Sequence, residues 1–396
     1  SIPVLMKPNA GLPKSVDGKT VYDVGADEFA DEVQKQVKNG VRIVGGCCGT
    51  TPQFIGAVVD KTANLKPKPV DKKDITVISS YTHTVEFGKR PILIGERINP
   101  TGKKRFKQAL KENDIGYILR EGIAQQERGV HVLDVNVGLP EIDEVEMLKT
   151  AVCEIQAIID LPLQIDTADA DAMAAALRRY NGKAMINSVN GNEKSMRAVF
   201  PLVKKYGGVV VALTLDEDGI PKTAEGRLEI AKRILKVAEE YGIDRREFVF
   251  DTLAMTVSAE PTAAMTSVAA LRLIKEKLGC NTSLGISNVS FGLPSRDALN
   301  SGFYLSALEN GLSAAIMNPY SEDMMKAYHA YLALHALDEN CEEYIKFMTS
   351  VGEPQKKAAV SEGDSKTELQ NAVSSGLKDR AAELTAELLK TDEPLE

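Results

Sequence analysis

The chain has 396 residues, of which 43% are hydrophobic and 26% are charged, with no tryptophan and a formal net charge of −8. This length accommodates two or three domains, each with its own core. No apolar run approaches the length needed to cross a bilayer, and the acidic balance gives no general attraction to nucleic acid or anionic lipid. We therefore expect a soluble globular protein that uses neither as a partner.

The start of the sequence, from Ser1 to Met6, lacks both an initiator methionine and the basic-then-apolar layout of a secretory signal. Five cysteines in 396 residues do not form a disulfide framework. Because free thiols agree with a reducing compartment, we expect a cytoplasmic location. We interpret Ser1 as a cut within a longer chain.

The first regular elements surround a pair of adjacent cysteines. A helical apolar spacing over 27–38 precedes a β-branched run at 41–44; a glycine loop with Cys47 and Cys48 follows, and a helix opens over 52–61. This order predicts one strand–helix unit of a parallel sheet, with two thiols at the carboxyl end of its strand. Two thiolates there suit a soft metal such as zinc, which would need a third ligand. A tight turn with two small residues, or a strained vicinal disulfide, is the alternative, and geometry alone leaves both open.

A charged, proline-punctuated stretch at 66–73 cannot continue regular structure and predicts a linker over 67–90. From residue 91 onward, short apolar runs alternate with helical segments, among them 105–128 and 225–242. Eight such units in about 255 residues are typical of a TIM (β/α)8 barrel. A doubly wound sheet would also alternate, but no glycine-rich dinucleotide loop is present. The eight predicted strands are 91–96, 131–136, 162–167, 184–188, 208–214, 248–251, 282–288 and 312–317.

The end of the chain predicts two short helices broken near Ser374-Ser375-Gly376, with an apolar stripe that includes Leu369, Leu377 and Leu384. Two short helices cannot bury such a stripe alone, so we interpret them as the first part of an incomplete helical domain. The predicted domains are 1–66, the barrel 91–345 and the helical segment 365–396, with linkers at 67–90 and 346–364.

Polar side chains gather where the predicted barrel strands end. Carboxylates accept hydrogen bonds from ring N–H and amino groups, and amides both donate and accept. A ring of such groups without histidine is a poor soft-metal site, and it suits a flat heterocycle such as a pterin. Helix capping explains any one of these residues equally well, but it is a weak explanation for six strand ends together. The strand-end residues are Glu96, Asn99, Asp134, Asn136, Asp166, Asn187, Asp251 and Asn288.

Two phrases near the beginning carry a specific resemblance. Pro8-Asn9-Ala10-Gly11-Leu12-Pro13 and Gly45-Gly46-Cys47-Cys48-Gly49-Thr50-Thr51-Pro52 resemble the closing part of homocysteine S-methyltransferase barrels. The resemblance covers roughly the first sixty residues and implies that Cys47 and Cys48 are zinc ligands. It also implies that residues 1–66 are the carboxyl-terminal part of a homocysteine-binding (β/α)8 barrel. The third cysteine of that family lies upstream, in a segment this chain does not contain.

The strand-end phrases of the barrel resemble the pterin-binding domain family, which includes dihydropteroate synthase and the methyltetrahydrofolate methyltransferases. Leu133-Asp134-Val135-Asn136, Met185-Ile186-Asn187-Ser188 and the run from Ile286 to Arg296 resemble the methyltransferase branch. The resemblance implies pterin contacts from Asp134, Asn136, Asp166, Asn187, Asp251 and Asn288, with Glu96, Asn99 and Arg296 close by. Asp169 is a weaker candidate. Asn288 is assigned the catalytic position near N5. An amide there can accept a hydrogen bond from protonated N5 or donate one to neutral N5, and it does not itself titrate.

The order of these segments is similar to that of the cobalamin-dependent methionine synthase family, with 365–396 like the start of a cobalamin-binding cap. This implies methyl transfer from 5-methyltetrahydrofolate to cob(I)alamin, and from methylcobalamin to homocysteine in a full-length enzyme, giving methionine and tetrahydrofolate. The implied cofactors are cobalamin, on a module in cis or on another chain, and Zn2+. The alternatives are a methyltetrahydrofolate:corrinoid protein methyltransferase, against which the paired cysteines argue, and a non-catalytic folate-binding fragment. Dihydropteroate synthase is the least favoured enzyme.

Overall fold

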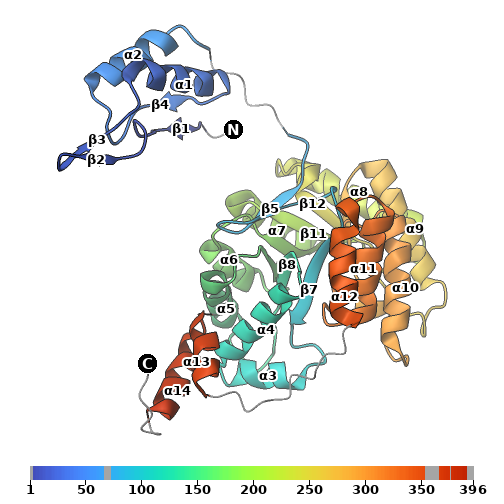
Figure 1. Ribbon diagram of the computed structural model, residues 1–396. Coiled ribbons are helices and arrows are strands. Elements are labelled where there is room, and N and C mark those ends of the chain that lie inside the picture. The colour runs from blue at the N-terminus through green and yellow to red at the C-terminus, as the bar shows by residue number, and fades with distance from the viewer. Residues whose placement is uncertain (1–2, 67–72, 353–364, 375, 390–396) are drawn as a thin grey trace. The chain divides into compact units, whose positions relative to one another are not determined.

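The computed structural model describes residues 3–66, 73–352, 365–374 and 376–389. The chain divides into two compact units, Ser1–Asp74 and Ile75–Glu396, and each is described by itself (Figure 1). In the part of the chain that the structure describes, no helix is both long and apolar enough to span a membrane.

The first unit is a small α/β arrangement. Strand β1 (Leu5–Met6) pairs in parallel with β4 (Ile43–Val44). The hairpin β2 (Lys14–Val16) and β3 (Lys19–Val21) lies between them in the sequence. Helices α1 (Ala26–Lys38) and α2 (Pro52–Thr62) pack together and bury Phe29, Ala30, Val33, Val37 and Val58. The expected order of helix, strand, cysteine loop and helix is therefore present. Leu5 and Ile43 remain exposed on the short sheet.

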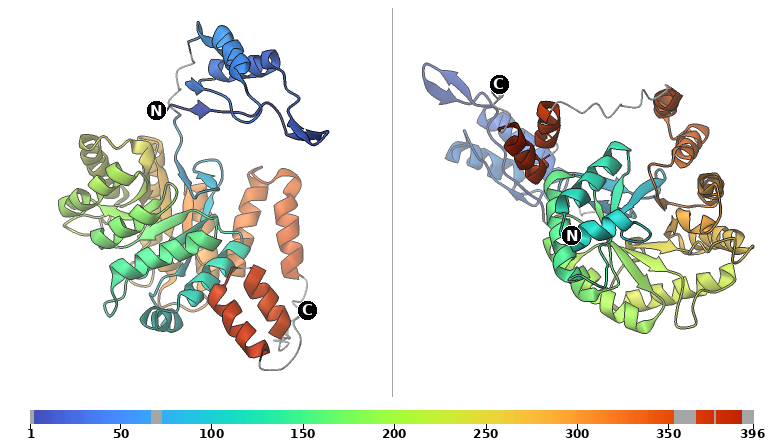
Figure 2. Two further views of the ribbon diagram at one scale, coloured as in Figure 1. Left: turned by 90° about the vertical axis from the view of Figure 1, so that its left-hand side faces the viewer. Right: turned by 90° about the horizontal axis from the view of Figure 1, so that it is seen from below.

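The second unit is built on a closed barrel of eight parallel strands, as predicted. Its helices surround the strands (Figure 2). The observed strands coincide with the predicted ones within a few residues, because most of them lie on short apolar runs between turn signals. They are β7 (Ile92–Ile98), β8 (Val132–Val135), β9 (Leu163–Asp166), β10 (Met185–Asn190), β11 (Val209–Leu213), β12 (Phe248–Asp251), β13 (Asn281–Gly285) and β14 (Ala314–Met317).

Most predicted helices are present, but the segment 105–128 is two helices instead of one. Asn113 adopts a left-handed φ of 56°, which ends the first helix. Asp114 then caps the second, accepting a hydrogen bond from the backbone N–H of Tyr117 at 2.9 Å. Up to residue 352, the α-helices of this unit are α3 (Lys104–Lys111), α4 (Ile115–Glu127), α5 (Glu144–Ile158), α6 (Ala170–Arg179), α7 (Glu193–Tyr206), α8 (Ala224–Glu240), α9 (Ala263–Leu278), α10 (Arg296–Glu309), α11 (Glu322–Leu334) and α12 (Glu342–Gly352).

Strand β13 ends earlier than predicted. It stops at Gly285, and residues Ile286–Ser290 form a 3₁₀ turn, so Asn288 lies in a turn and not on a strand. Arg296 explains the fold of this segment. Its Nη2 donates to the carbonyl of Ser287 at 2.6 Å, and its Nε donates to Ser290 Oγ at 2.9 Å. A side chain from the next helix thus holds the backbone that follows the strand.

Part of the expected linker 67–90 belongs to the barrel, which corrects the sequence interpretation. Strands β5 (Val77–Ser79) and β6 (Thr84–Glu86) form a hairpin. Ile78 is fully buried and packs with apolar residues of the barrel interior, and Ser79 exchanges backbone hydrogen bonds with Lys183. The hairpin therefore closes the amino-terminal end of the barrel. Its strands are too short for a periodic pattern, so the preceding proline-rich stretch dominated the prediction.

The two predicted C-terminal helices are α13 (Ser365–Ser374) and α14 (Lys378–Leu388). They lie beside α4 and α5 in Figure 1. Leu377, between them, packs against the barrel core, so the pair buries part of its apolar stripe on the flank of the barrel. Of the expected connector 346–364, residues 346–352 continue α12, and the remainder lies outside the described residues.

Candidate functional site

The interior of the barrel changes from apolar to polar toward the carboxyl ends of its strands. Strand registers place the inward-facing residues in layers of four from alternate strands. From the amino-terminal end upward, the layers are Val132, Met185, Val249 and Ala314; Ile94, Gln164, Val211 and Ser283; Asp134, Asn187, Asp251 and Ile316; and Glu96, Asp166, Leu213 and Gly285. Five predicted pterin residues therefore occupy the two uppermost layers of one mouth.

Asp134 is held from below by a residue that sequence reasoning missed. Gln164 Nε2 donates to Asp134 Oδ1 at 2.6 Å, and both side chains are buried. Burial, together with the nearby charge of Asp166, raises the pKa of Asp134 well above its usual range. Asp134 is thus suited to carry a proton and to donate a hydrogen bond. Gln164 precedes Asp166 by two residues on the same strand, and that alternation was the available signal for it.

Asp166 and Asn136 form the second pair at the mouth. Asn136 Nδ2 donates to Asp166 Oδ2 at 3.0 Å, while Asn136 Oδ1 accepts from the backbone N–H of Gly138. Burial raises the pKa of Asp166 to about 6, although the hydrogen bond from Asn136 opposes this. The strand register sets Asn187 directly beside Asp166.

Asp251 lies on the other side of the mouth, and its side chain is buried. Its Oδ1 accepts from the backbone N–H of Leu253 at 2.7 Å. Burial raises the pKa of this carboxyl to about 6, against the lowering effects of that hydrogen bond and of the Arg227 charge. Thus burial favours the protonated form of all three carboxyls, and the pKa of about 6 makes Asp166 and Asp251 carboxylates above about pH 6.

Glu96 approaches the 3₁₀ turn after β13. Ser287 Oγ donates to its carboxylate at 3.1 Å, and burial raises the pKa of Glu96. Lys103, which the sequence did not single out, donates to the carbonyls of Glu96 at 3.0 Å and Asn99 at 3.2 Å. Asn99 Oδ1 accepts from the N–H of Thr101, so this side chain stabilises its own turn.

Asn288 is exposed at the rim of the mouth. A Cβ on Gly285 would lie 3.0 Å from Asn288 Nδ2, so the glycine makes room for this amide above the strand end. Arg296 is occupied with the turn and lies over the ring of Phe291 at 4.7 Å. Asp169 caps α6, accepting from the N–H groups of two residues in its first turn, which is a structural role.

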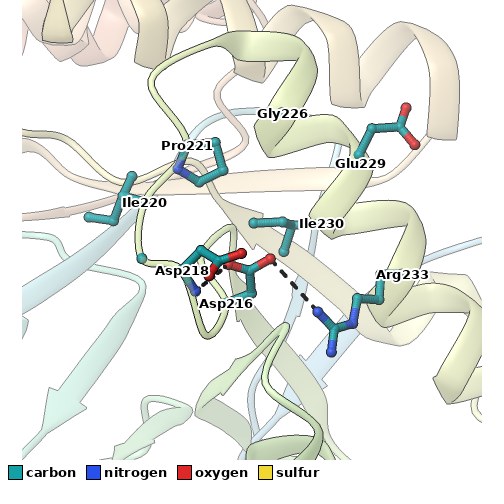
Figure 3. A pocket seen from close by; sticks show the side chains of 9 residues that line it. Asp216, Asp218, Ile220, Pro221, Gly226, Glu229, Ile230 and Arg233 are labelled. Carbon is teal, nitrogen blue, oxygen red and sulfur yellow. Dashed lines mark hydrogen bonds and ion pairs between the residues drawn. The ribbon is translucent and has the colours of Figure 1, made fainter.

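A separate hollow lies outside this ring of residues, between the β11–α8 loop and α8 (Figure 3). Asp216 and Asp218 contribute to it from the loop, and Arg233 contributes from the helix. Arg233 is already paired with Glu217 at 2.8 Å and lies 3.7 Å from Asp216. None of the predicted pterin residues lines this hollow.

The paired thiols of the first unit are both exposed, with their sulfur atoms 3.9 Å apart. Two ligands of a tetrahedral zinc with Zn–S bonds of about 2.3 Å lie about 3.8 Å apart, so this pair fits two corners of such a site. Asn9 Oδ1 accepts from the N–H of Cys48 and fixes the loop. No group of three or more histidine, cysteine, aspartate or glutamate side chains suited to a metal occurs among the described residues.

The closed barrel with its polar mouth defines a class of protein. Residues 95–318, more than half of the chain, match the family described as pterin binding enzyme. The chain therefore belongs to this family. Residues 1–62 match a second family, homocysteine S-methyltransferase, over the segment that holds the paired thiols.

The relatives are more specific than the families. The chain is 34% identical over 334 residues to a methionine synthase of Mycobacterium tuberculosis, a match that covers 80% of this chain and 28% of the relative. It is 32% identical over 338 residues to a methionine synthase of Mycobacterium leprae, with the same two shares. The chain thus spans little more than a quarter of the length of these methyltransferases. The predicted resemblance to methionine synthases is confirmed.

Solved structures support the fold alone. A dihydropteroate synthase of Xanthomonas albilineans with 4-aminobenzoic acid is 20% identical, with a TM-score of 0.50, and covers 66% of this chain and 99% of its own. A Yersinia pestis enzyme of the same kind, bound to a pterine-sulfa conjugate, is 14% identical, with a TM-score of 0.52 and the same two shares.

Proposed function

We propose that the barrel binds 5-methyltetrahydrofolate through its pterin ring and transfers the N5 methyl group to cob(I)alamin. The observation that carries this proposal is the polar layering of the mouth. Gln164 Oε1 and Ser283 Oγ, in the layer below Asp134 and Asp251, are buried without a hydrogen-bond partner among the described residues. Buried polar atoms left unpaired in an apo site are a cost that a polar ligand or ordered water offsets.

The protonation pattern of the mouth suits the edge of a pterin. Asp166 and Asp251, as carboxylates, would accept hydrogen bonds from ring N–H and amino groups, and protonated Asp134 would donate to a ring nitrogen or carbonyl. Two accepting sites and one donating site hold a flat ring in one orientation. The ring is thereby positioned with N5 toward the rim, where Asn288 lies.

Asn288 is proposed to act at N5. The methyl group leaves a tertiary amine, and this requires positive charge on that nitrogen. An amide can accept from protonated N5 and donate to neutral N5 without itself gaining a proton. When bound, cob(I)alamin supplies the strong nucleophile, from a module in cis or on another chain. The role of this chain is to orient the methyl group and to stabilise the proton.

The first unit is proposed to be the carboxyl-terminal part of a homocysteine-binding barrel, with residues 365–396 the start of a cobalamin-binding cap. Cys47 and Cys48 would then hold zinc together with a cysteine from outside this chain, and zinc would keep the homocysteine sulfur as a thiolate. The exposed apolar side chains of Leu5 and Ile43 agree with strands that pack against further structure. Because all five cysteines are free, we also propose a cytoplasmic location.

The experiment mixes the 396-residue chain with free cob(I)alamin and 5-methyltetrahydrofolate and follows methylcobalamin by its absorption. We expect turnover that depends on the protein. Binding of the folate without methyl transfer would instead support a folate-binding fragment. Transfer to a corrinoid protein, with no zinc site even after the upstream barrel segment is restored, would support the corrinoid methyltransferase alternative. No folate binding would refute the proposal.

A further inference from the structure

Arg227, on α8, is a buried arginine whose guanidinium reaches the loop behind Asp251. It is 2% exposed. Its Nη1 donates to the carbonyls of Thr252 at 2.5 Å and Leu253 at 3.1 Å, and to Ser267 Oγ at 2.9 Å. One side chain therefore connects α8, the loop after β12 and α9.

The loop that Arg227 holds is the one that orients Asp251. Leu253 has a left-handed φ of 63°, which is unfavourable for a residue with a branched side chain. Its N–H donates to Asp251 Oδ1, and its carbonyl accepts from both Arg227 and Ser267 Oγ, the latter at 2.8 Å. Hydrogen bonds at both ends thus keep Leu253 in this conformation and aim its N–H at the carboxylate.

We infer that Arg227 is a positioning residue for Asp251: it fixes the loop whose N–H orients the carboxylate, and its charge favours the ionised carboxylate at the pterin edge. This inference rests on the proposed function, because it assigns Asp251 to the pterin.

The surroundings of Arg227 support an electrostatic role. No carboxylate lies within ion-pair distance of its guanidinium in the part of the chain that the structure describes. The charges that act on it are those of Glu260 and Asp251, and burial lowers its pKa. An arginine remains charged even so, because its ordinary pKa is above about 12. A buried cation without an ion pair is costly, and a functional carboxylate nearby is a reason to retain it.

The groups that face Asp251 come from α8, the loop after β12, β11 and β13. Arg227 is the charged group that lowers the pKa of Asp251, and the backbone N–H groups of Leu253 and Gly285 act in the same direction. The neighbouring strands contribute Leu213 from β11 and Ser283 from β13, neither of which titrates in the range concerned. The carboxyls of Glu96, Asp134 and Asp166 belong to β7, β8 and β9, across the barrel, and are not among the causes acting on Asp251.

Arg233 provides a matched control on the same helix. Figure 3 shows it beside Asp216, at the outer hollow. It forms an exposed pair with Glu217, and its side chain is 42% exposed. Replacing Arg233 removes the same charge from the same helix without touching the loop behind Asp251.

The experiment measures the dissociation constant of 5-methyltetrahydrofolate by calorimetry between about pH 5.5 and 8.5, on the full chain and on four variants: Arg227→Met, Arg227→Lys, Arg233→Met and Asp251→Asn. Native binding should weaken below about pH 6, where Asp251 gains its proton. In Arg227→Met we expect the pH of half-maximal affinity to move from about 6 to about 7, on top of a loss of about threefold at every pH from the released loop. Affinity should therefore be about threefold lower at pH 8.5, about fivefold lower at pH 7 and about twentyfold lower at pH 5.5.

The other variants separate the possible failures. Arg227→Lys keeps the charge and loses the several N–H donors of the guanidinium, so its affinity should fall about threefold at every pH, with the midpoint unchanged. Arg233→Met should match the native chain. If Arg227→Met does not fold, native-like affinity in Arg227→Lys overturns the inference. A loss of folate affinity in Arg227→Met that is equal at all pH values also overturns the inference. Native-like binding in Asp251→Asn would refute the pterin placement itself, whereas weak binding there with no change in Arg227→Met would refute only the role of Arg227.

Discussion

Asp251→Asn should stabilise the fold at neutral pH while weakening folate binding. The pKa of Asp251 rises from the ordinary 3.8 to about 6 in the folded chain, chiefly because the carboxyl is buried. The folded state therefore holds the proton more tightly than the unfolded state, and stability falls as the pH rises between about 4 and 6. The difference corresponds to about 3 kcal/mol above pH 6, at about 1.4 kcal/mol per tenfold change in proton affinity.

The amide variant should recover part of this energy. The side-chain oxygen of the introduced amide can still accept from the N–H of Leu253, but its NH2 group cannot accept from the N–H of Gly285, which also interacts with the native carboxyl. We therefore expect a gain of about 1–2 kcal/mol in the free energy of unfolding at about pH 8, which should turn into a loss of about 1 kcal/mol near pH 4, where the native carboxyl is protonated and the native chain is more stable. Folate binding at pH 8 should weaken by roughly 1–3 kcal/mol, the usual cost of an unsatisfied buried partner.

The assay is urea unfolding followed by circular dichroism at several pH values, with Asp218→Asn as the control because Asp218 is exposed on the β11–α8 loop. The control should show no pH-dependent difference from the native chain. Asp251→Asn could instead be less stable than the native chain at about pH 8, by the same amount as at pH 5. That result would show that the reasoning about a costly buried carboxylate is wrong. Unchanged folate affinity would place the pterin elsewhere.

Three further outcomes are expected. Asn288→Ala should lower the rate of methyl transfer to cob(I)alamin far more than it lowers folate affinity, and equal losses would remove its assignment to N5. Gly376→Ala should destabilise the packing of the C-terminal helices on the barrel by about 1–2 kcal/mol, because φ of this residue is +71° and the new Cβ would lie 2.9 Å from Ile158 Cγ2. An unchanged rate of proteolysis within 365–388 would contradict this. Zinc in the present chain should stay far below one per protein by elemental analysis, with Cys47 and Cys48 open to alkylation; tightly held zinc that is lost in Cys47→Ser would reveal a missed ligand.

The alternation of strands and helices in the barrel could be predicted because it is a local property of the sequence. Most strands lie on short apolar runs, and the helices carry a 3.6-residue apolar spacing, so neither pattern depends on distant residues. The polar strand ends were predictable for a related reason. In a parallel barrel all carboxyl ends meet at one face, so Asp134, Asp166 and Asp251 had to share a mouth once the topology was assumed.

Contacts between distant segments were decided by the tertiary structure. Whether Gln164 faces the barrel interior beneath Asp134 depends on strand register, which a single strand does not encode. Asn288 lies in a turn because Arg296, on the next helix, binds the backbone before it. On α8 the apolar spacing of Ala231, Ile234 and Ala238 places Arg227 on the buried face and Arg233 outside it. The sequence does not show what the buried guanidinium contacts. Only the packing of three elements around Arg227 takes its charge out of water and directs it toward Asp251.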